Sequence, residues 1–292
     1  MKKPKIYVGG QAVIEGVMMR SPKTIATAVR TPSGEITVKK EAIRSISERF
    51  PILKKPFLRG TVALVESLIY GMKSLSYSAQ AAGEEEEQLS SWQMALTMAV
   101  SVLLAIVFFL VIPTYAAKFI PGVTDSAFRL NVVEGILRLI IFLSYIKAIS
   151  MTADIRRVFE YHGAEHKTIW TYESGEELTV ENVMRHTRLH PRCGTNFLLI
   201  VMVVSIFVFA FLGWPSFIER VWSRIVLRPV VAGISYEMIP ATTNPVIQTI
   251  FRPGLWLQYL TTREPHPDQI EVAIEAMKAA KPSDEGDVTE IK

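Results

Sequence analysis

The chain is 292 residues long, 49% hydrophobic and 21% charged, with a formal net charge of +4. This mild charge, without a basic stripe studded with aromatic residues, argues against a nucleic-acid-binding protein, and a single cysteine excludes an internal disulfide framework. Since the chain is both strongly hydrophobic and charged, apolar and polar residues must be separated into blocks.

Residues 1–55 form a predicted β-rich segment. The stretch 24–40, TIATAVRTPSGEITVKK, has two β-branched runs around a turn at 31–34, which predicts a β-hairpin within a small antiparallel sheet. Earlier glycines at 9, 10 and 16 are not followed by the Gly-Lys-Ser/Thr ending of a phosphate loop. We therefore expect no nucleotide site here.

Three apolar stretches predict transmembrane helices. Residues 94–112 and 196–213 contain no charged side chain and are long enough to cross a bilayer. Residues 132–151 are a third predicted span, in which charged side chains must lie near the interface or face other helices. These charged residues are Glu134, Arg138 and Lys147.

Two further stretches predict helices at the membrane surface. Residues 57–80 have spaced apolar residues among charged ones, which is typical of an amphipathic helix lying on the membrane or packed against the bundle. Residues 217–239 predict an interfacial helix followed by a short return crossing, with Pro229 breaking the helix. If 225–250 crosses back, all polar segments share one side.

Basic residues indicate the orientation. Thirteen Lys and Arg precede residue 60, which predicts that the N-terminal segment and the loop 152–195 are cytoplasmic. No cleavable signal peptide is expected, because the first apolar run begins about ninety residues into the sequence. An acidic run at 84–87 before that first span is read as a solvated loop.

The stretch 162–193 carries the residues that suggest chemistry. It holds four of the five histidines and the only cysteine. His162 and His166 are four residues apart, as are His186 and His190, so each pair shares one face of a helix. We expect the third span to continue as one helix to Gly163, and a short helix over 180–189, capped by Thr179, to present the second pair.

Imidazole and thiolate groups in this number suit zinc or another divalent transition metal. His162 and His166 are predicted ligands, completed by His190 or Cys193. Three ligands leave a position for water and favour hydrolysis, with Glu165 as general base. The order His-x-x-Glu-His is also that of inverted zincins. In a continuous helix, however, Glu165 lies about 100° from His166 around the axis.

A closed set of His162, His166, His190 and Cys193 would instead be structural. Other carboxylates remain open as ligands or as groups behind the ligands. Glu15 and Glu237 are candidates for the supporting role, and Glu15 could equally pair with Arg20 or stay solvated. Four acidic residues follow the first histidine pair and could each supply a ligand: Glu173, Glu176, Glu177 and Glu181.

These elements predict a mainly α integral membrane protein with three or four transmembrane helices, amphipathic helices and a small N-terminal cytoplasmic sheet. Its segments are the β-rich 1–55, the membrane helices 56–250 with the cytoplasmic His/Cys loop 152–195, and the cytoplasmic 251–292. That last segment is expected to contain a helix of about twelve residues, begun by a capping box of Asp268 and Glu271, and a disordered tail.

Four blocks of sequence resemble those of the YqhQ-like family, a bacterial membrane-protein family of unknown function labelled a predicted metal-dependent enzyme. They are GGQAVIEGVMMR at 9–20, YHGAEHKTIWTYE at 161–173, HPRCGTNFL at 190–198 and PGLWLQYLTTREP at 253–265. The resemblance covers nearly the whole chain. It implies a multi-pass protein of the bacterial inner membrane whose marked polar blocks converge.

Two functions remain open at this point. One is a zinc-dependent hydrolase of unknown substrate with its site facing the cytoplasm. The other is a non-catalytic membrane scaffold or accessory factor, in membrane-protein insertion or envelope assembly, with a structural His/Cys cluster and membrane-protein partners. Transport is weaker, because the charges in the third span make no convincing pathway and no inverted repeat appears.

Overall fold

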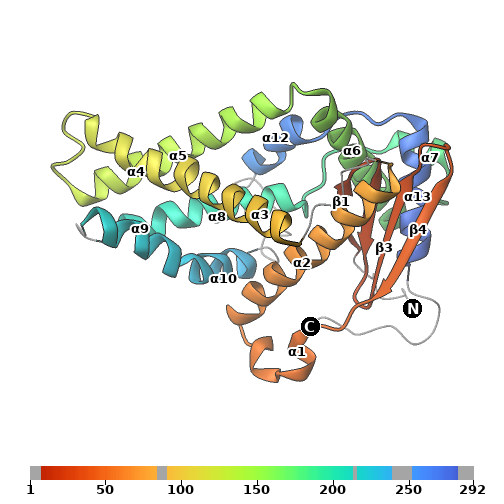
Figure 1. Ribbon diagram of the computed structural model, residues 1–292, viewed down its shortest axis with the longest axis horizontal. Helices are drawn as coiled ribbons and strands as arrows, with labels where there is room; N and C mark the ends of the chain where they lie inside the picture. Colours follow the sequence, from red (N-terminus) through yellow and green to blue (C-terminus); the bar gives the residue numbers. More distant parts are fainter. Residues whose placement is uncertain (1–7, 84–90, 213–215, 239–251, 282–292) are drawn as a thin grey trace.

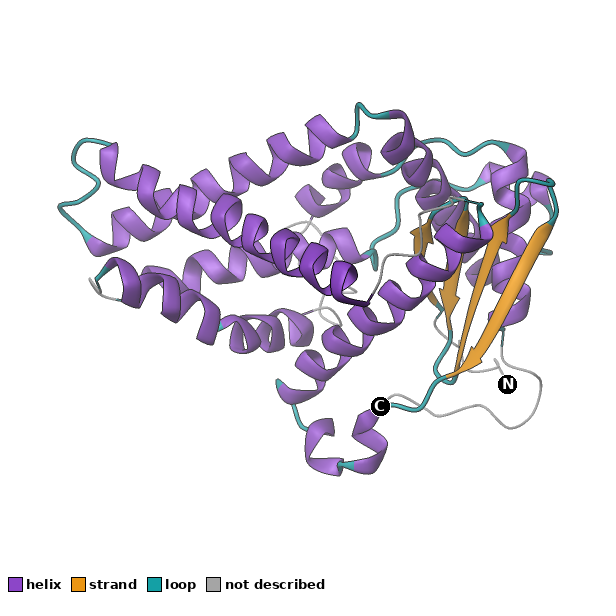
Figure 2. Ribbon diagram, in the orientation of Figure 1, coloured by secondary structure: helices purple, strands orange, loops and turns teal. Residues whose placement is uncertain are grey.

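A computed structural model describes residues 8–83, 91–212, 216–238 and 252–281 of the chain (Figure 1). The described chain is mainly helical and has one small antiparallel sheet near its N-terminus (Figure 2). This combination confirms the predicted helical class and the N-terminal sheet. The acidic run at 84–87, residues 239–250 of the expected return crossing and the expected C-terminal tail lie outside the described residues.

The sheet has four strands in the order β1-β2-β3-β4. They are β1 (Gly9–Val13), β2 (Gly16–Arg20), β3 (Thr24–Arg30) and β4 (Ile36–Ala42). The predicted hairpin over 24–40 is confirmed, and its turn contains Gly34 at φ 86°, a conformation that glycine adopts without strain. A two-residue turn joins β1 to β2 and places Glu15 at φ 48°.

Helices cover both faces of the sheet, because alternate residues of its strands are apolar on each side. On one face, Val17, Met19, Ala26 and Ala28 form a core with α6 (Ala153–Ser174) and α13 (Pro267–Ala280). On the other face lies α2 (Leu58–Ala81), reached through α1 (Ile46–Arg49) and a 3-10 turn (Pro51–Lys54). The N-terminal sheet and the C-terminal helix thus share one core.

The amphipathic helix predicted over 57–80 is confirmed as α2. Its contacts with the sheet are polar as well as apolar, since Arg20 binds Glu66 and Thr27 Oγ1 hydrogen-bonds to Ser74 Oγ at 3.0 Å. Its other end packs against α10 (Arg228–Met238), where Arg59 binds Glu237. This helix therefore connects the sheet to the remaining helices.

The apolar helices extend away from the sheet to one side (Figure 1). Residues 99–119 form one helical stretch with a mean hydropathy of 2.4, long and apolar enough to cross a membrane. The second uncharged segment forms a shorter apolar helix. The elements are α3 (Ser91–Ile106), a π-helical turn (Val107–Val111), α4 (Ile112–Ala116), a 3-10 turn (Ala117–Phe119), α5 (Ala127–Ile149), α8 (Gly194–Ala210), α9 (Phe217–Val226) and α10.

Buried ion pairs join these apolar helices. Glu134 of α5 is 1% exposed and binds both Arg138 and Arg224, the latter from α9. Arg224 Nη2 also donates to Asn131 Oδ1 at 2.6 Å, and Arg138 Nε donates to the carbonyl of Phe109 in the π-helical turn at 2.8 Å. Glu134 and Arg138 of the predicted third span therefore face other helices, whereas Lys147, near the end of α5, is exposed.

The prediction of one continuous helix from 136 to Gly163 is wrong. The helix ends at Ile149, and α6 starts at Ala153. At the break, the hydroxyls of Ser150 and Thr152 donate to the carbonyls of Lys147 and Ile149. Such side-chain hydrogen bonds compete with the helical ladder, so His162 and His166 lie in the middle of a new helix.

The predicted helix over 180–189 is also too long. Thr179 caps it as expected, but α7 covers only Val180–Arg185, and His186 already has extended backbone. The residue before a proline is disfavoured in a helix, and His190 precedes Pro191. The two histidines therefore do not share a helix face.

The final helix begins differently from the prediction. His266 is the N-cap of α13, Pro267 occupies the first turn, and the side chain of Gln269 accepts from the amide of His266 at 2.9 Å. Gln269 rather than Glu271 therefore closes the capping box. Before it, α12 (Arg252–Thr261) packs against α8.

Candidate metal centre

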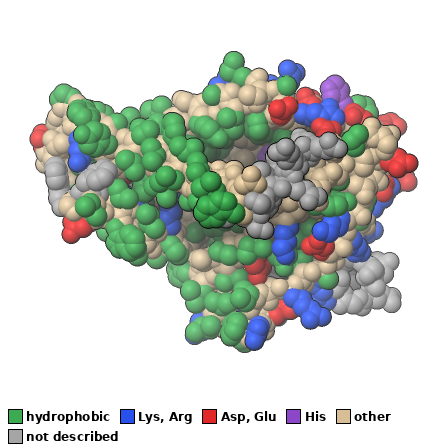
Figure 3. Space-filling view, in the orientation of Figure 1, with side chains coloured by type: hydrophobic (Ala, Val, Ile, Leu, Met, Phe, Trp, Pro, Cys, Tyr) green, Lys and Arg blue, Asp and Glu red, His purple; other side chains and the backbone are tan. Residues whose placement is uncertain are grey.

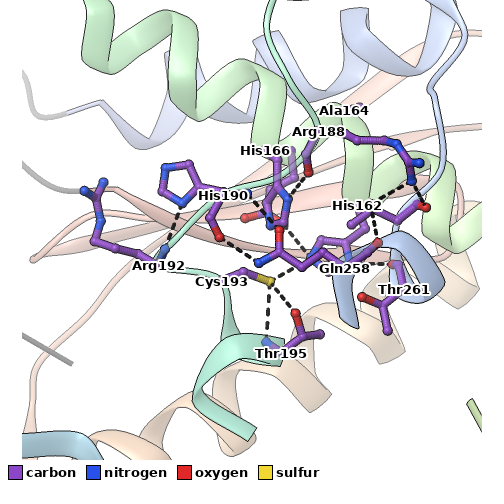
Figure 4. Close-up of polar contacts among 12 residues, drawn as sticks. His162, Ala164, His166, Arg188, His190, Arg192, Cys193, Thr195, Gln258 and Thr261 are labelled. Carbon is purple, nitrogen blue, oxygen red and sulfur yellow. Dashed lines mark hydrogen bonds and ion pairs between the residues drawn. The ribbon is translucent and has the colours of Figure 1, made fainter. Parts of the chain in front are cut away.

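Two histidines and the cysteine converge between α6 and the start of α8 (Figure 4). His162 and His166 lie one turn apart on α6, with ring centroids 4.4 Å apart. Cys193 is the N-cap of α8, which brings its Sγ to 3.3 Å from His162 Nε2. One ligand atom from each of these three residues lies within 4.8 Å of the other two.

Backbone carbonyls fix the orientation of both rings. His162 Nδ1 lies 2.9 Å from the carbonyl oxygen of Thr261, and His166 Nδ1 lies 2.5 Å from that of Arg188. A carbonyl can only accept, so each Nδ1 carries the proton and each Nε2 presents a lone pair to the cluster. Metal-binding histidines are commonly held in this way.

His166 Nε2 is the clearest sign of a missing ligand. The residue is 1% exposed, and this atom has no hydrogen-bond partner among the described residues. Burial lowers the pKa of His166, with neighbouring Cys193 opposing the effect, so the ring is held in the neutral form that binds metals. A buried acceptor without a partner is unfavourable, and a metal ion would satisfy it.

Cys193 completes the group from the start of a helix. Its Sγ accepts from the backbone N–H of Thr195 at 3.4 Å and lies 3.1 Å from the hydroxyl of the same residue. Amides at a helix N-terminus favour a negatively charged group. The sulfur is thus placed to act as an anionic ligand.

Glu165 reaches the cluster despite its different position around the helix. Its Oε2 lies 3.7 Å from His162 Nε2, on the side of His162 rather than that of His166. The carboxylate is 4% exposed, and burial raises its pKa while His162 and His190 oppose that rise. A buried carboxylate beside the ligands suits a group that accepts and returns a proton.

Strand β1 holds Glu165 in place from the other side. A Cβ atom on Gly10 would stand 2.7 Å from both Cγ and Oε1 of Glu165. Only glycine leaves room for that side chain against the strand. The N-terminal sheet is therefore part of the site.

His190 lies beside the three ligand atoms and is not one of the three. The centroid of its ring lies 5.7 Å from the ring centroid of His166 and 4.8 Å from that of Trp170. The Arg192 amide donates to its Nδ1 at 3.3 Å, which leaves the proton on Nε2. Burial lowers its pKa to about 4, so His190 is a neutral buried group that supports the cluster.

The remaining sequence candidates lie outside the group of three ligand atoms. Glu173 binds Arg192 and lies 3.7 Å from His190 Nε2, so it is next to His190. His186 pairs with Glu176 at 3.2 Å, and Glu181 binds Arg185. Glu15 binds Arg157 of α6 and accepts from the hydroxyl of Tyr161 at 3.3 Å, while Arg20 binds Glu66 instead. Glu237 of α10 binds Arg59 of α2.

A cavity of about 820 Å³ opens onto the cluster. Its walls come from β1, α2, α6 and the first turns of α8, and they include the three candidate ligands and Glu165. Figure 3 shows that the surface is mainly hydrophobic over the extended helices and rich in charged side chains over the sheet. Because β1 and α8 both line the cavity, the site lies where these two parts of the molecule meet.

Several supporting groups had no signal in the sequence. Gln258 of α12 holds His190 through both its backbone groups, at 2.8 and 2.7 Å. The carbonyl groups of Arg188 and Thr261 orient the ligands, and backbone groups leave no pattern in a sequence. Only the paired glycines at 9 and 10 hinted at a close approach.

Comparisons with known proteins place the chain among proteins without a described activity. The model of a family described as a protein of unknown function, DUF1385, matches residues 55–283. The chain is 40% identical over 294 residues to the uncharacterized protein YqhQ of Bacillus subtilis (strain 168), covering 94% of this chain and 92% of that protein. No solved structure matches the chain.

Proposed function

This chain belongs to the DUF1385 family, and from the geometry of its site we propose that it is a membrane-bound, metal-dependent hydrolase. His162, His166 and Cys193 would hold the metal, and Glu165 would act as the general base. The observation that carries the proposal is the convergence of three ligand atoms within 4.8 Å, one of them the buried, unpartnered His166 Nε2.

Zinc fits this set of donors best. Imidazole nitrogens and a thiolate are its usual ligands, and its bonds of about 2.0–2.3 Å place donor atoms about 3.5 Å apart. The separations here require only small side-chain movements. Three protein ligands leave one position for water, and a zinc ion bound there would supply Lewis acidity and an acidified water.

The chain's own residues supply the rest of the chemistry. Thr261 and Arg188 hold the histidine rings in the ligating tautomer. His190, which packs on Trp170, covers one side of His166. Glu165, buried and 3.7 Å from His162 Nε2, would take a proton from water and pass it to the leaving group. The cavity would admit a substrate of moderate size.

Membrane attachment is supported by the exposed apolar surface. The helical stretch Ala99–Phe119 has the length and hydropathy of a span, and α8 is a shorter apolar helix without a charged residue. Their outward side chains are largely apolar and exposed, including Leu103, Phe108 and Phe207. In this proposal the extended helices lie in the bilayer and the metal centre lies at its cytoplasmic surface.

One observation favours the structural alternative. Glu165 Oε2 lies 3.7 Å from His162 Nε2, so a movement of its side chain toward the other two ligand atoms would make it a fourth ligand, and a closed four-ligand site would have no position for water. The protein would then be a scaffold, in which the metal ties α6 and α8 together. Glu165→Gln separates the two functions. Loss of the carboxylate charge should abolish hydrolysis and leave the metal bound if Glu165 is the base, and should release the metal if Glu165 is a ligand.

The test is elemental analysis of protein purified in detergent. We expect about one zinc ion or other transition-metal ion per chain in the wild type, its loss from a His162→Ala, His166→Ala double variant, and its retention in His186→Ala, whose histidine lies outside the cluster. Glu165→Gln should keep the metal and lose metal-dependent hydrolysis of p-nitrophenyl acetate. Loss of metal in Glu165→Gln would identify a closed structural site, and a metal-free wild type after reconstitution would refute both readings.

A further inference from the structure

The two edges of the sheet differ in a way that bears on the substrate. On β4, the outer strand at one end, Lys39, Lys40 and Glu41 form a charged run, and such charges protect an edge from pairing with other chains. On β1, at the other end, the sequence is Gly-Gly-Gln-Ala-Val and carries no charge. The β1 edge therefore lacks the usual protection.

The hydrogen-bond pattern shows which groups of β1 point outward. The Ser21 amide donates to the Thr24 carbonyl, and the Arg30 amide donates to the Glu15 carbonyl. These bonds fix the odd-numbered residues of β2 as those that pair with β3. Because pairing alternates along an antiparallel strand, the even-numbered residues of β2 pair with β1.

On β1, the residues opposite those even-numbered positions are 9, 11 and 13. The N–H and C=O groups of Gly10 and Ala12 consequently point outward from the edge of the sheet, in the direction opposite to β2. The next outward amide, that of Ile14, donates to Ser78 Oγ of α2 at 3.2 Å. No described residue hydrogen-bonds to the outward groups of Gly10 and Ala12, so this edge keeps its capacity to pair with another strand.

This edge opens into the cavity of the metal centre. Residues 9–12 line the cavity together with the ligands, and Gly10 packs directly on Glu165. A strand paired with β1 would lie about 4.8 Å from it. Its backbone would then enter the cavity that Glu165, His162, His166 and Cys193 also line.

We propose that the substrate is an extended peptide segment that pairs with β1 as a fifth strand, so that one of its amide bonds lies at the metal centre. The inference rests on the proposed hydrolase function and gives its substrate class. Main-chain pairing would provide affinity, as in other cases of strand addition. In the reaction, the water oxygen bonds to the carbonyl carbon, the C–N bond breaks, and Glu165 carries a proton from the water to the amine nitrogen.

The cavity walls indicate the side chains of such a peptide. Val158, Phe197 and Leu198 are among the apolar residues lining it. Successive side chains of a strand point to opposite faces, so alternate residues of the peptide should be apolar. A suitable probe is a fluorescein-labelled peptide of about ten residues with leucine alternating with threonine.

The experiment measures binding of this probe by fluorescence anisotropy and hydrogen exchange of residues 8–13 by mass spectrometry. We expect the probe to bind the wild type and slow exchange in that segment. N-methylation of alternate residues of the probe should weaken binding about tenfold in one register and little in the other, because only one set of amides faces β1. The zinc-free His162→Ala, His166→Ala variant should still bind.

A matched pair of variants locates the binding edge. Ala12→Pro removes an outward amide of β1. On β4, the Ile43 amide donates to the Lys23 carbonyl, so the odd-numbered residues of β4 hydrogen-bond to β3 and the amide of Lys40 points outward. Lys40→Pro therefore removes an outward amide of β4 without touching the cavity. Ala12→Pro should weaken probe binding about tenfold, whereas Lys40→Pro should leave it unchanged. Thermal unfolding of each variant checks its fold, and the N-methylated probes test the wild type directly.

Several results would overturn the inference. Equal binding of all N-methylated probes would show that the probe does not pair with β1 through its main chain. Displacement of the probe by lysophospholipid, or a dimer of the wild type paired through β1, would give the edge another occupant. A wild type that holds zinc and hydrolyses the ester but binds no peptide would refute the peptide substrate and leave the hydrolase standing. If the wild type itself holds no metal after reconstitution, the hydrolase is refuted and with it the peptide as a substrate, even where Ala12-dependent binding shows that the β1 edge pairs with a strand.

Discussion

At the scale of single residues, the site depends on close contacts as much as on the ligands. Its histidines are oriented by backbone carbonyls of Thr261 and Arg188, which belong to segments remote in sequence. Its carboxylate is confined by a glycine of β1. The geometry therefore depends on segments that supply no ligand themselves.

Gly10 and Gly9 provide a test of this confinement. In Gly10→Ala the new methyl group would stand 2.7 Å from Glu165, so we expect Glu165 to be displaced, hydrolysis to fall at least about tenfold, and unfolding to become easier by about 1–3 kcal/mol. Gly9→Ala is the control, because a Cβ atom there meets nothing within 4 Å. Similar activity in the two variants would show that β1 does not position Glu165.

At the scale of helices, buried charges join the apolar elements. Glu134 and Arg138 are an i, i+4 pair on α5 whose carboxylate also binds Arg224 of α9. Glu181 and Arg185 are an i, i+4 pair on α7 with side chains 78% and 67% exposed. The two pairs have the same chemistry and differ in burial.

We therefore expect unequal effects of the same substitution. Glu134→Gln leaves two buried guanidinium groups without their counter-charge and should reduce the free energy of unfolding in detergent by about 3–5 kcal/mol. Glu181→Gln removes a solvated pair and should change it by less than about 1 kcal/mol. Equal losses would show that the interior between α5 and α9 is hydrated.

At the scale of the whole molecule, the proposal places the extended helices in the bilayer and the sheet in the cytoplasm. The loop after α4 and the hairpin between β3 and β4 lie at opposite ends of the structure (Figure 1). Asp125 and Ser33 are exposed in these two places. The only native cysteine, Cys193, is buried.

Asp125→Cys and Ser33→Cys test the orientation. A membrane-impermeant maleimide should label Asp125→Cys in intact spheroplasts and should label Ser33→Cys only after the membrane is permeabilised. The wild type gives the background labelling of Cys193. Protein recovered in the soluble fraction, or the reverse labelling pattern, would contradict the proposed topology.

The sequence by itself determined the elements that depend on local pattern. The hairpin over 24–40 and the helix over 57–80 follow from β-branched runs and spaced apolar residues. The short stretch that holds His162, His166, His190 and Cys193 was enough to name all four as candidate ligands, and the structure brings ligand atoms of three of them, His162, His166 and Cys193, within 4.8 Å of one another. The predicted long helix was wrong because the hydroxyls of Ser150 and Thr152 donate to carbonyls of the preceding turn, and apolar periodicity carries no signal of such bonds.

Only the tertiary structure decided which groups complete the site. Cys193 rather than His190 lies within reach of His162 and His166 because α8 begins at Cys193, while the Arg192 amide holds His190 Nδ1. Gly10 and Glu165 are about 150 residues apart in the sequence, and they come into contact because the sheet packs on α6. Side-chain spacing in a sequence describes one helix or strand, whereas contacts between distant segments arise from the burial of their apolar faces together.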